Sequence, residues 1–186
     1  TGLELFLLID DPWRVFLTTD HPNAGLFFFY PQVIKLLMDR DYRAELLQGI
    51  NARARREALL PELDREYSLY EIAIMTRAAT ARVLGLKDKG HLGIGADADV
   101  TIYAPSEDKE EMFAHPRYVL KDGEIVVRDG QLVKERPGRT LYVTPSYAPG
   151  IVKDIRAHFE EHYTIAFENY AVGPEYVAHA QVIPCK

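Results

Sequence analysis

The chain has 186 residues, of which 47% are hydrophobic and 27% are charged, and its formal net charge is -6. This composition is typical of a globular protein and excludes a basic nucleic-acid-binding surface. The single cysteine, Cys185, excludes an internal disulfide, and no apolar run reaches the ~18 residues of a membrane-spanning helix. We therefore expect a soluble cytoplasmic protein that binds neither nucleic acid nor membrane.

The N-terminal part of the chain predicts two apolar segments followed by a loop. Residues 3–9 are almost wholly apolar and fit either a helix or a strand. This apolar segment ends at Asp10-Asp11-Pro12. Residues 14–19 then predict a buried strand, and residues 21–25 predict a loop. Thr1-Gly2-Leu3 has neither a methionine nor the layout of a signal peptide, so we expect an upstream segment in the natural protein.

Helical patterns fill residues 31–85. Pro31 suits the first turn of one helix, and a second is predicted over residues 42–58. Ser68 and Glu71 form a capping box at the start of a third helix, and Gly85 stands where a positive φ ends it. Apolar residues recur at helical spacing along these segments: Val33, Ile34, Leu37, Met38, Leu46, Leu47, Ile50, Ile72, Met75, Ala79 and Val83.

The pattern changes to short strands after Lys89. Residues 100–103, 118–121, 124–128 and 131–134 are short apolar runs, and Asp-Gly pairs separate the last three of them, which predicts a small antiparallel meander. A helix is predicted over residues 151–162, followed by an irregular aromatic tail. We therefore expect three parts, residues 1–89, 90–144 and 145–186.

Asp20 is the candidate catalytic residue. It ends the apolar run of residues 16–19 and a Pro/Asn/Gly turn follows it. A carboxylate at the carboxyl end of a buried strand is where a (β/α)₈ barrel enzyme keeps its chemistry. The pattern predicts an α/β protein, the C-terminal part of a metal-dependent hydrolase barrel whose other site residues lie upstream. An N-cap or turn aspartate is the alternative interpretation.

Several blocks of sequence resemble the A-subunit family of formylmethanofuran dehydrogenase and of the similar formyltransferase/hydrolase complex of methylotrophs, in the amidohydrolase superfamily. The resemblance covers the whole chain, as the C-terminal third of that family. The blocks are Thr18-Thr-Asp-His-Pro-Asn23, residues 64–73 and 75–78, Lys89-Gly-His-Leu-Gly-Ile-Gly-Ala-Asp-Ala-Asp-Val100 and Phe167-Glu-Asn-Tyr170.

The resemblance implies a barrel with a dinuclear zinc site, a small composite β domain and partner subunits in a complex. Of the family's metal ligands only the aspartate maps onto this chain, at Asp20. The implied reaction forms or hydrolyses the N-formyl group of methanofuran, in one-carbon metabolism. One departure is visible, because the family has Gly-Pro-Phe where this chain has Gly25-Leu26-Phe27.

Further residues are candidates for binding the substrate. His21 and Asn23 follow Asp20 and are predicted to orient substrate or the carboxylate, although Asn23 also fits an Asx turn. Arg77 is predicted to contact the acidic tail of the carrier, whereas ion pairing on the helix surface is the alternative. Three more arginines in the predicted helical segments are candidates for the same role: Arg40, Arg43 and Arg82.

A second motif and a second function class remain open. His158-Phe-Glu-Glu-His162 matches the His-x-x-Glu-His pattern of zinc peptidases, but it lacks a credible third ligand, and we expect no zinc there. The alternative to an enzyme subunit is a non-catalytic scaffold fragment that binds partner subunits through the meander and the tail. An upstream His-x-His and lysine in the parent gene would favour the enzyme.

Overall fold

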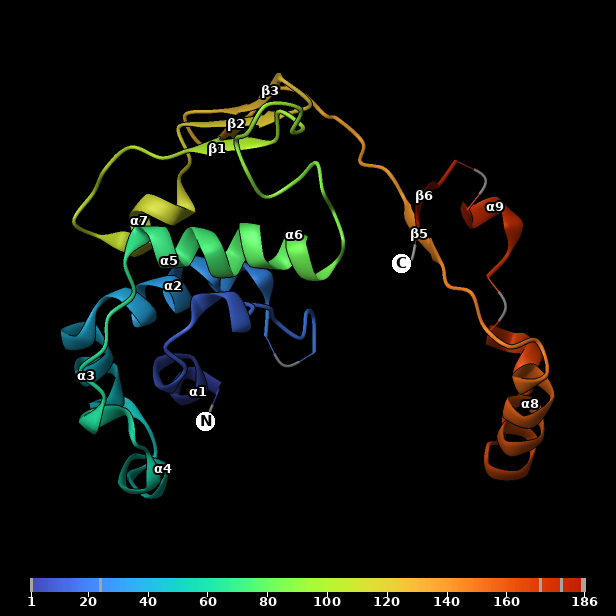
Figure 1. Ribbon diagram of the computed structural model, residues 1–186. Coiled ribbons are helices and arrows are strands. Elements are labelled where there is room, and N and C mark those ends of the chain that lie inside the picture. Colours follow the sequence, from blue (N-terminus) through green and yellow to red (C-terminus); the bar gives the residue numbers. More distant parts are fainter. Residues whose placement is uncertain (1, 24, 171, 178, 185–186) are drawn as a thin grey trace. The chain divides into compact units, whose positions relative to one another are not determined.

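The computed structural model describes residues 2–23, 25–170, 172–177 and 179–184. Thr1 and Cys185 lie outside the described residues. The chain divides into two compact units, Thr1–Arg136 and Pro137–Lys186 (Figure 1). Within the described residues, no helix combines the length and the apolar character that crossing a membrane requires.

The first unit is mainly helical. Its helices are α1 (Gly2–Leu8), α2 (Tyr30–Met38), α3 (Arg40–Gly49), α4 (Ala52–Glu57), α5 (Leu69–Ala73), α6 (Ala79–Val83) and α7 (Lys109–Ala114). A π-helical stretch, Ile74–Ala78, joins α5 to α6, and 3₁₀ turns form at Pro12–Arg14, Phe27–Phe29 and Leu60–Glu62.

The core of this unit joins segments that are far apart in the sequence. Its buried residues are Leu7, Val15, Ile34, Leu37, Tyr67, Ile72 and Met75. Tyr67 connects two of the segments, because its hydroxyl donates to the Phe6 carbonyl at 2.5 Å and its N–H to the Leu37 carbonyl at 2.9 Å. The predicted apolar positions on α2 and on the capped helix are therefore core residues at Ile34, Leu37, Ile72 and Met75.

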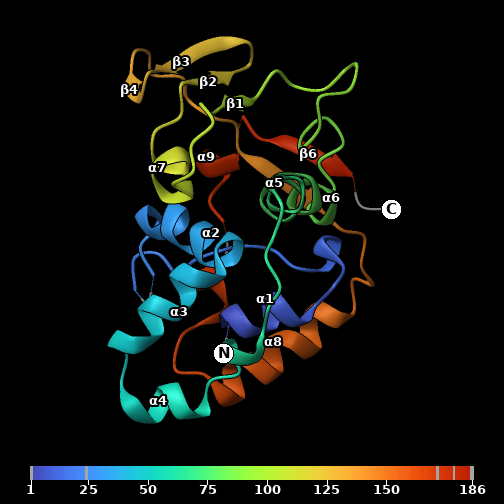
Figure 2. The same ribbon diagram turned by 90° about the vertical axis from the view of Figure 1, so that its left-hand side faces the viewer.

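The predicted meander is confirmed. Strands β1 (Val100–Ile102), β2 (Tyr118–Lys121), β3 (Glu124–Arg128) and β4 (Gln131–Leu132) form an antiparallel sheet in that order. Asp122 and Asp129 have φ values of 50° and 48°, and the glycines that follow have 79° and 74°, as the turns between strands require. Helix α7 connects β1 to β2 and lies between the sheet and α2 in both views (Figures 1 and 2).

Residues 15–20 are extended, and no described strand pairs with them, so the predicted strand over residues 14–19 stays a prediction. Two other predicted features of the first unit are wrong. The helix over residues 42–58 is two helices, because the Asn51 side chain accepts from the N–H groups of Arg53 and Ala54 and starts α4. Leu46, Ile50 and Val83 are exposed rather than in the core.

The second unit contains β5 (Leu141–Thr144), α8 (Ile151–His162), a 3₁₀ turn (Phe167–Tyr170), α9 (Pro174–Val177) and β6 (Gln181–Pro184). Helix α8 has the bounds that the sequence predicts. The tail is not irregular throughout, since β6 pairs in parallel with β5. The described residues therefore form a mixed helix and sheet structure with two separate sheets, and the barrel and the three-part division of the chain stay predictions.

Candidate functional site

Asp20 lies where an extended segment turns into a tight loop. The Gly25 N–H donates to the Asp20 carbonyl at 3.3 Å and closes this loop. The side chains of Asp20, His21 and Asn23 are all exposed. The structure thus places these three predicted site residues on one loop, with the carboxylate open to a ligand, while their catalytic and binding roles stay predictions.

Two phenylalanine rings lie against the same loop. The His21 ring is 4.8 Å from the Phe27 ring and meets it edge-on, and the Phe27 and Phe28 rings are 4.4 Å apart. We call His21, Phe27 and Phe28 the aromatic cluster. Sequence reasoning does not single out these phenylalanines, although the run Phe27-Phe28-Phe29 directly after the loop is a signal for them.

Arg77 lies on the π-helical stretch, and its guanidinium donates to the Thr76 carbonyl at 3.0 Å. Among the described residues it forms no ion pair, and its side chain is exposed. Arg40 instead pairs with Asp64 at 2.8 Å, and Arg82 lies over the Trp13 ring. In the described part of the chain, Arg77 and Arg82 thus both keep a guanidinium without a carboxylate partner, whereas Arg40 has one.

The prediction that Arg43 contacts the acidic tail of the substrate is wrong, because its side chain is not accessible. Its side chain is buried, with a relative exposure of 2%. Its guanidinium donates at 2.7 Å to the carbonyls of Leu36 and Arg65. Burial lowers its pKa below the ordinary value for arginine. Arg43 therefore serves to hold the end of α2 against the segment that precedes α5.

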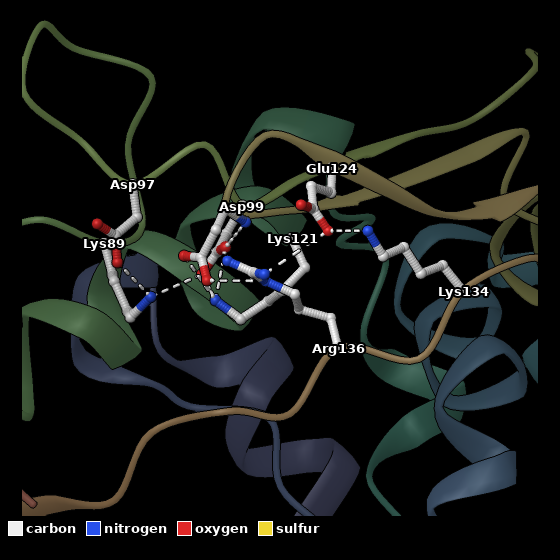
Figure 3. A network of polar contacts seen from close by, with 8 residues as sticks. Lys89, Asp97, Asp99, Lys121, Glu124, Lys134 and Arg136 are labelled. Carbon is white, nitrogen blue, oxygen red and sulfur yellow. Dashed lines mark hydrogen bonds and ion pairs between the residues drawn. The ribbon is translucent and has the colours of Figure 1, made fainter. Parts of the chain in front are cut away.

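The Gly-Ala-Asp-Ala-Asp block forms an ion-pair network rather than a reactive site (Figure 3). Lys89 Nζ lies 2.7 Å from Asp97 and 2.6 Å from Asp99, and Lys121 Nζ lies 2.8 Å from Asp99. Partial burial acts to raise the pKa of Asp99. The hydrogen bonds from Lys121, Lys89 and the Asp122 N–H outweigh it and hold that pKa far below its usual range.

These aspartates do not suit a dinuclear zinc centre. Asp97, Asp99 and Asp122 each offer a carboxylate oxygen, and the three oxygens lie within 4.8 Å of one another. However, the ammonium groups of Lys89 and Lys121 already bind them, and Asp20 is not part of this group. The network fastens the loop before β1 to the β2–β3 turn. The described residues thus offer a single carboxylate, Asp20, at the predicted metal position.

The two histidines of α8 lie with their rings stacked, 4.2 Å apart. The His162 Nδ1 atom is 2.9 Å from the His158 carbonyl, so a backbone group already engages that nitrogen. In the described residues, no third nitrogen, sulfur or carboxylate ligand completes a group with them. That they bind no zinc stays a prediction.

Comparison with known proteins shows close similarity over the whole chain. The family model of the amidohydrolase family matches residues 3–131. Protein FwdA of Methanocaldococcus jannaschii is 46% identical over 194 residues, which cover 98% of this chain and 34% of that protein. The A-subunit of the formyltransferase/hydrolase complex Fhc of Methylorubrum extorquens is 40% identical over 189 residues, which cover 100% of this chain and 34% of that protein.

A solved structure is similar as well. A chain of the crystal structure of the formyltransferase/hydrolase complex FhcABCD from Methylorubrum extorquens, in complex with methylofuran, superposes with a TM-score of 0.81 at 39% identity. The match covers 100% of this chain and 35% of that one. The chain thus spans about a third of the length of the relatives it matches. It belongs to the amidohydrolase family.

Proposed function

We propose that residues 1–186 are part of an amidohydrolase subunit that forms or hydrolyses the N-formyl group of a methanofuran-type carrier. The observation that carries the proposal is the match over the whole chain to a complex whose crystal structure contains methylofuran. The identity of 46% to FwdA and of 40% to the Fhc relative supports the same assignment. The whole protein would form the (β/α)₈ barrel, with the extended residues 15–20 as its last strand.

In this proposal Asp20 is the catalytic carboxylate and one metal ligand. A water oxygen attacks the formyl carbon, the C–N bond breaks, and formate and the free amine leave. Asp20 takes the proton from the attacking water and gives it to the departing nitrogen, which lets one carboxylate act as base and then as acid. A dinuclear zinc centre, when bound, supplies a water of lowered pKa and polarises the formyl oxygen.

The described residues fit one ligand of such a centre. Asp20 is exposed, and its loop is closed by a backbone bond that leaves the carboxylate oxygens available. The remaining ligands would come from outside residues 1–186. His21 and Asn23, on the same loop, would position the formyl group, and Arg77 would bind a carboxylate of the carrier's tail.

Partner subunits are part of the proposal. In the second unit none of the described side chains is buried, and Ile151 and Ile155 of α8 are among its exposed large hydrophobic residues. The Fhc relative is by name a component of a complex. This unit and the β1–β4 sheet are the surfaces that we expect partner subunits to cover. The same observation favours the second candidate function, a scaffold segment that binds partners without taking part in chemistry.

One substitution in the full-length complex separates the two candidates. Asp20→Asn should leave assembly and most of the metal in place but lower formamide turnover by about 100-fold or more, since an amide cannot accept the proton. Asp41→Asn, at an exposed position of α3, is the matched control and should leave turnover unchanged. Near wild-type turnover by Asp20→Asn would contradict the catalytic role and favour the scaffold.

A further inference from the structure

Helix α4 has no buried residue. Each of its six residues, Ala52–Glu57, is exposed. In both views the helix lies beside the end of α3, at the opposite end of the first unit from the β1–β4 sheet (Figures 1 and 2). An isolated helix of this length is not stable in water, and packing of one face usually provides the missing stability. Since the described residues bury no face of α4, a contact with another molecule would stabilise it.

Three arginines give α4 a positive surface in a chain whose net charge is -6. Arg53 pairs with Glu57 at 3.0 Å, but the two side chains are 79% and 66% exposed, and such a surface pair contributes little. Arg55 donates to the Gln48 side-chain oxygen at 3.2 Å, which connects α4 to the last turn of α3. Arg56 is exposed, and no carboxylate of the described residues pairs with it. The helix therefore offers guanidinium groups to the carboxylates of another molecule.

Exposed aliphatic side chains flank these arginines in the chain. Leu46 is 39% exposed, Ile50 43% and Leu59 48%. Leu46 and Ile50 are four positions apart, which is the spacing of neighbours on one helix face. Protein interfaces combine an apolar centre with arginine and contain little lysine, and residues 46–59 contain three arginines and no lysine. We call the following side chains the arginine face: Leu46, Ile50, Arg53, Arg55, Arg56 and Leu59.

We propose that the arginine face docks a partner subunit whose surface carries Asp and Glu side chains around an apolar centre. The inference rests on the proposed function, in which the chain works in a complex, and it adds a surface to the second unit and the β1–β4 sheet. Carboxylates next to Arg55 and Arg56 would offset the repulsion between these neighbours and accept charge-assisted, bidentate hydrogen bonds from them. A second copy of the chain fits less well, because a two-fold interface places the same patch against itself and would bring arginines against arginines.

The test measures how the full-length chain binds its partner subunits, by surface plasmon resonance at several salt concentrations. Arg56→Glu should raise Kd by about 5- to 20-fold at low salt and slow association, and the effect should shrink as salt screens the charges. Ile50→Ser should raise Kd by about 3- to 10-fold at every salt concentration, since loss of apolar burial is not screened. Lys87→Glu is the matched control. It changes the charge by the same amount at an exposed position outside the arginine face, and it should leave Kd nearly unchanged.

Hydrogen exchange locates the contact without a substitution. The amides of α4 should exchange more slowly in the assembled complex than in the full-length chain alone, because docking suppresses local opening of the helix. Wild-type Kd for Arg56→Glu, together with equal exchange of α4 in the free chain and the complex, would show that the arginine face is only solvated and would overturn the inference.

Two other outcomes would also overturn it. Slow exchange of α4 in the full-length chain alone, at every concentration, would show that the rest of the same chain covers the face. Protection that grows with the concentration of that chain alone would show that a second copy covers it. Failure of the proposed function has a different sign, namely a wild-type complex that assembles with a salt-dependent Kd but cleaves no formamide. The Arg56→Glu complex, assembled at high subunit concentration, should keep wild-type formamide turnover, because Arg56 lies outside the candidate site.

Discussion

Gly90 lies directly against Ala81 of α6: a β-carbon at Gly90 would come within 2.6 Å of the Ala81 β-carbon and 2.8 Å of the Arg77 carbonyl. The backbone φ at Gly90 is +77° as well. Glycine is thus required twice, for space and for backbone conformation. At Gly90, the loop that carries Lys89 therefore packs closely against the π-helical stretch and α6.

Gly90→Ala should therefore destabilise the protein by about 2–4 kcal/mol, the sum of a left-handed backbone penalty and overpacking. Urea unfolding followed by circular dichroism measures the change. Gly95→Ala is the control, because Gly95 has a φ of +89° but nothing within 4 Å of a β-carbon. It should lose only the backbone part, about 1–2 kcal/mol. Equal losses for the two variants would contradict the packing role of Gly90.

Arg43 gives a second prediction. Arg43→Met keeps much of the apolar stem but leaves the carbonyls of Leu36 and Arg65 without their donor. We expect a loss of about 3 kcal/mol or more in the free energy of unfolding, because buried acceptors without partners are costly. Arg43→Lys should recover only part of it, since an ammonium cannot donate to both sides in the fork geometry. Arg56→Met, at an exposed position of α4, should change stability little.

The parts of this fold that could be predicted from the sequence depend on neighbours in the chain. The capping box at Ser68 needs only Glu71, and the strand turns need only Asp-Gly pairs, so both are confirmed. The pairing of β6 with β5 and the hydrogen bond from Arg43 to the Arg65 carbonyl join residues some 20 to 40 positions apart. Such contacts leave no periodic pattern in either segment, which is why the sequence predicts neither the paired tail nor the buried Arg43.

In the candidate site, too, the sequence predicts the features that depend on neighbouring residues and not those that depend on distant ones. The loop after Asp20 follows from the local turn residues, and the structure shows that loop with an exposed carboxylate. The aromatic cluster depends on how the loop closes before Phe27, which residue types alone do not reveal. The Lys89 network likewise depends on Lys121 and Asp122 in the β2–β3 hairpin. Among the described residues, no group of three potential metal ligands includes Asp20, so in the proposed function the other ligands would come from outside residues 1–186.

The capping box at the start of α5 gives a third prediction. The Ser68 side chain accepts from the Glu71 N–H, and the Glu71 carboxylate accepts from the Ser68 N–H at 2.9 Å. Ser68→Ala should cost about 1 kcal/mol of stability, since one N–H at the helix end loses its acceptor. Ser146→Ala, at an exposed position outside any helix, should cost nothing measurable. A similar midpoint in urea for both variants would show that the box does not stabilise this helix.

The last prediction concerns pH and the network around Asp99. The pKa of Asp99 is lowered in the folded protein, so its contribution is present above the ordinary pKa of an aspartate, about 4, and is lost as the pH falls toward the folded value. The pKa of Lys89 is raised by its hydrogen bonds to Asp97 and Asp99. Its contribution is therefore present below the ordinary pKa of lysine and is lost only as the pH rises through the raised value.

The free energy of unfolding should accordingly decrease as the pH is lowered, and the decrease should be smaller in Asp99→Asn. At pH 7 we expect Asp99→Asn to cost about 1–3 kcal/mol, because charge-assisted hydrogen bonds from Lys89 and Lys121 are lost. The difference between wild type and variant should shrink as the pH falls below about 4, because the Asp99 carboxylate takes up its proton in the unfolded chain at a higher pH than in the folded protein. Asp41→Asn, on the exposed face of α3, is the control. Urea midpoints measured from about pH 2 to pH 7 give both curves, and a constant difference across that range would show that Asp99 does not titrate with a lowered pKa.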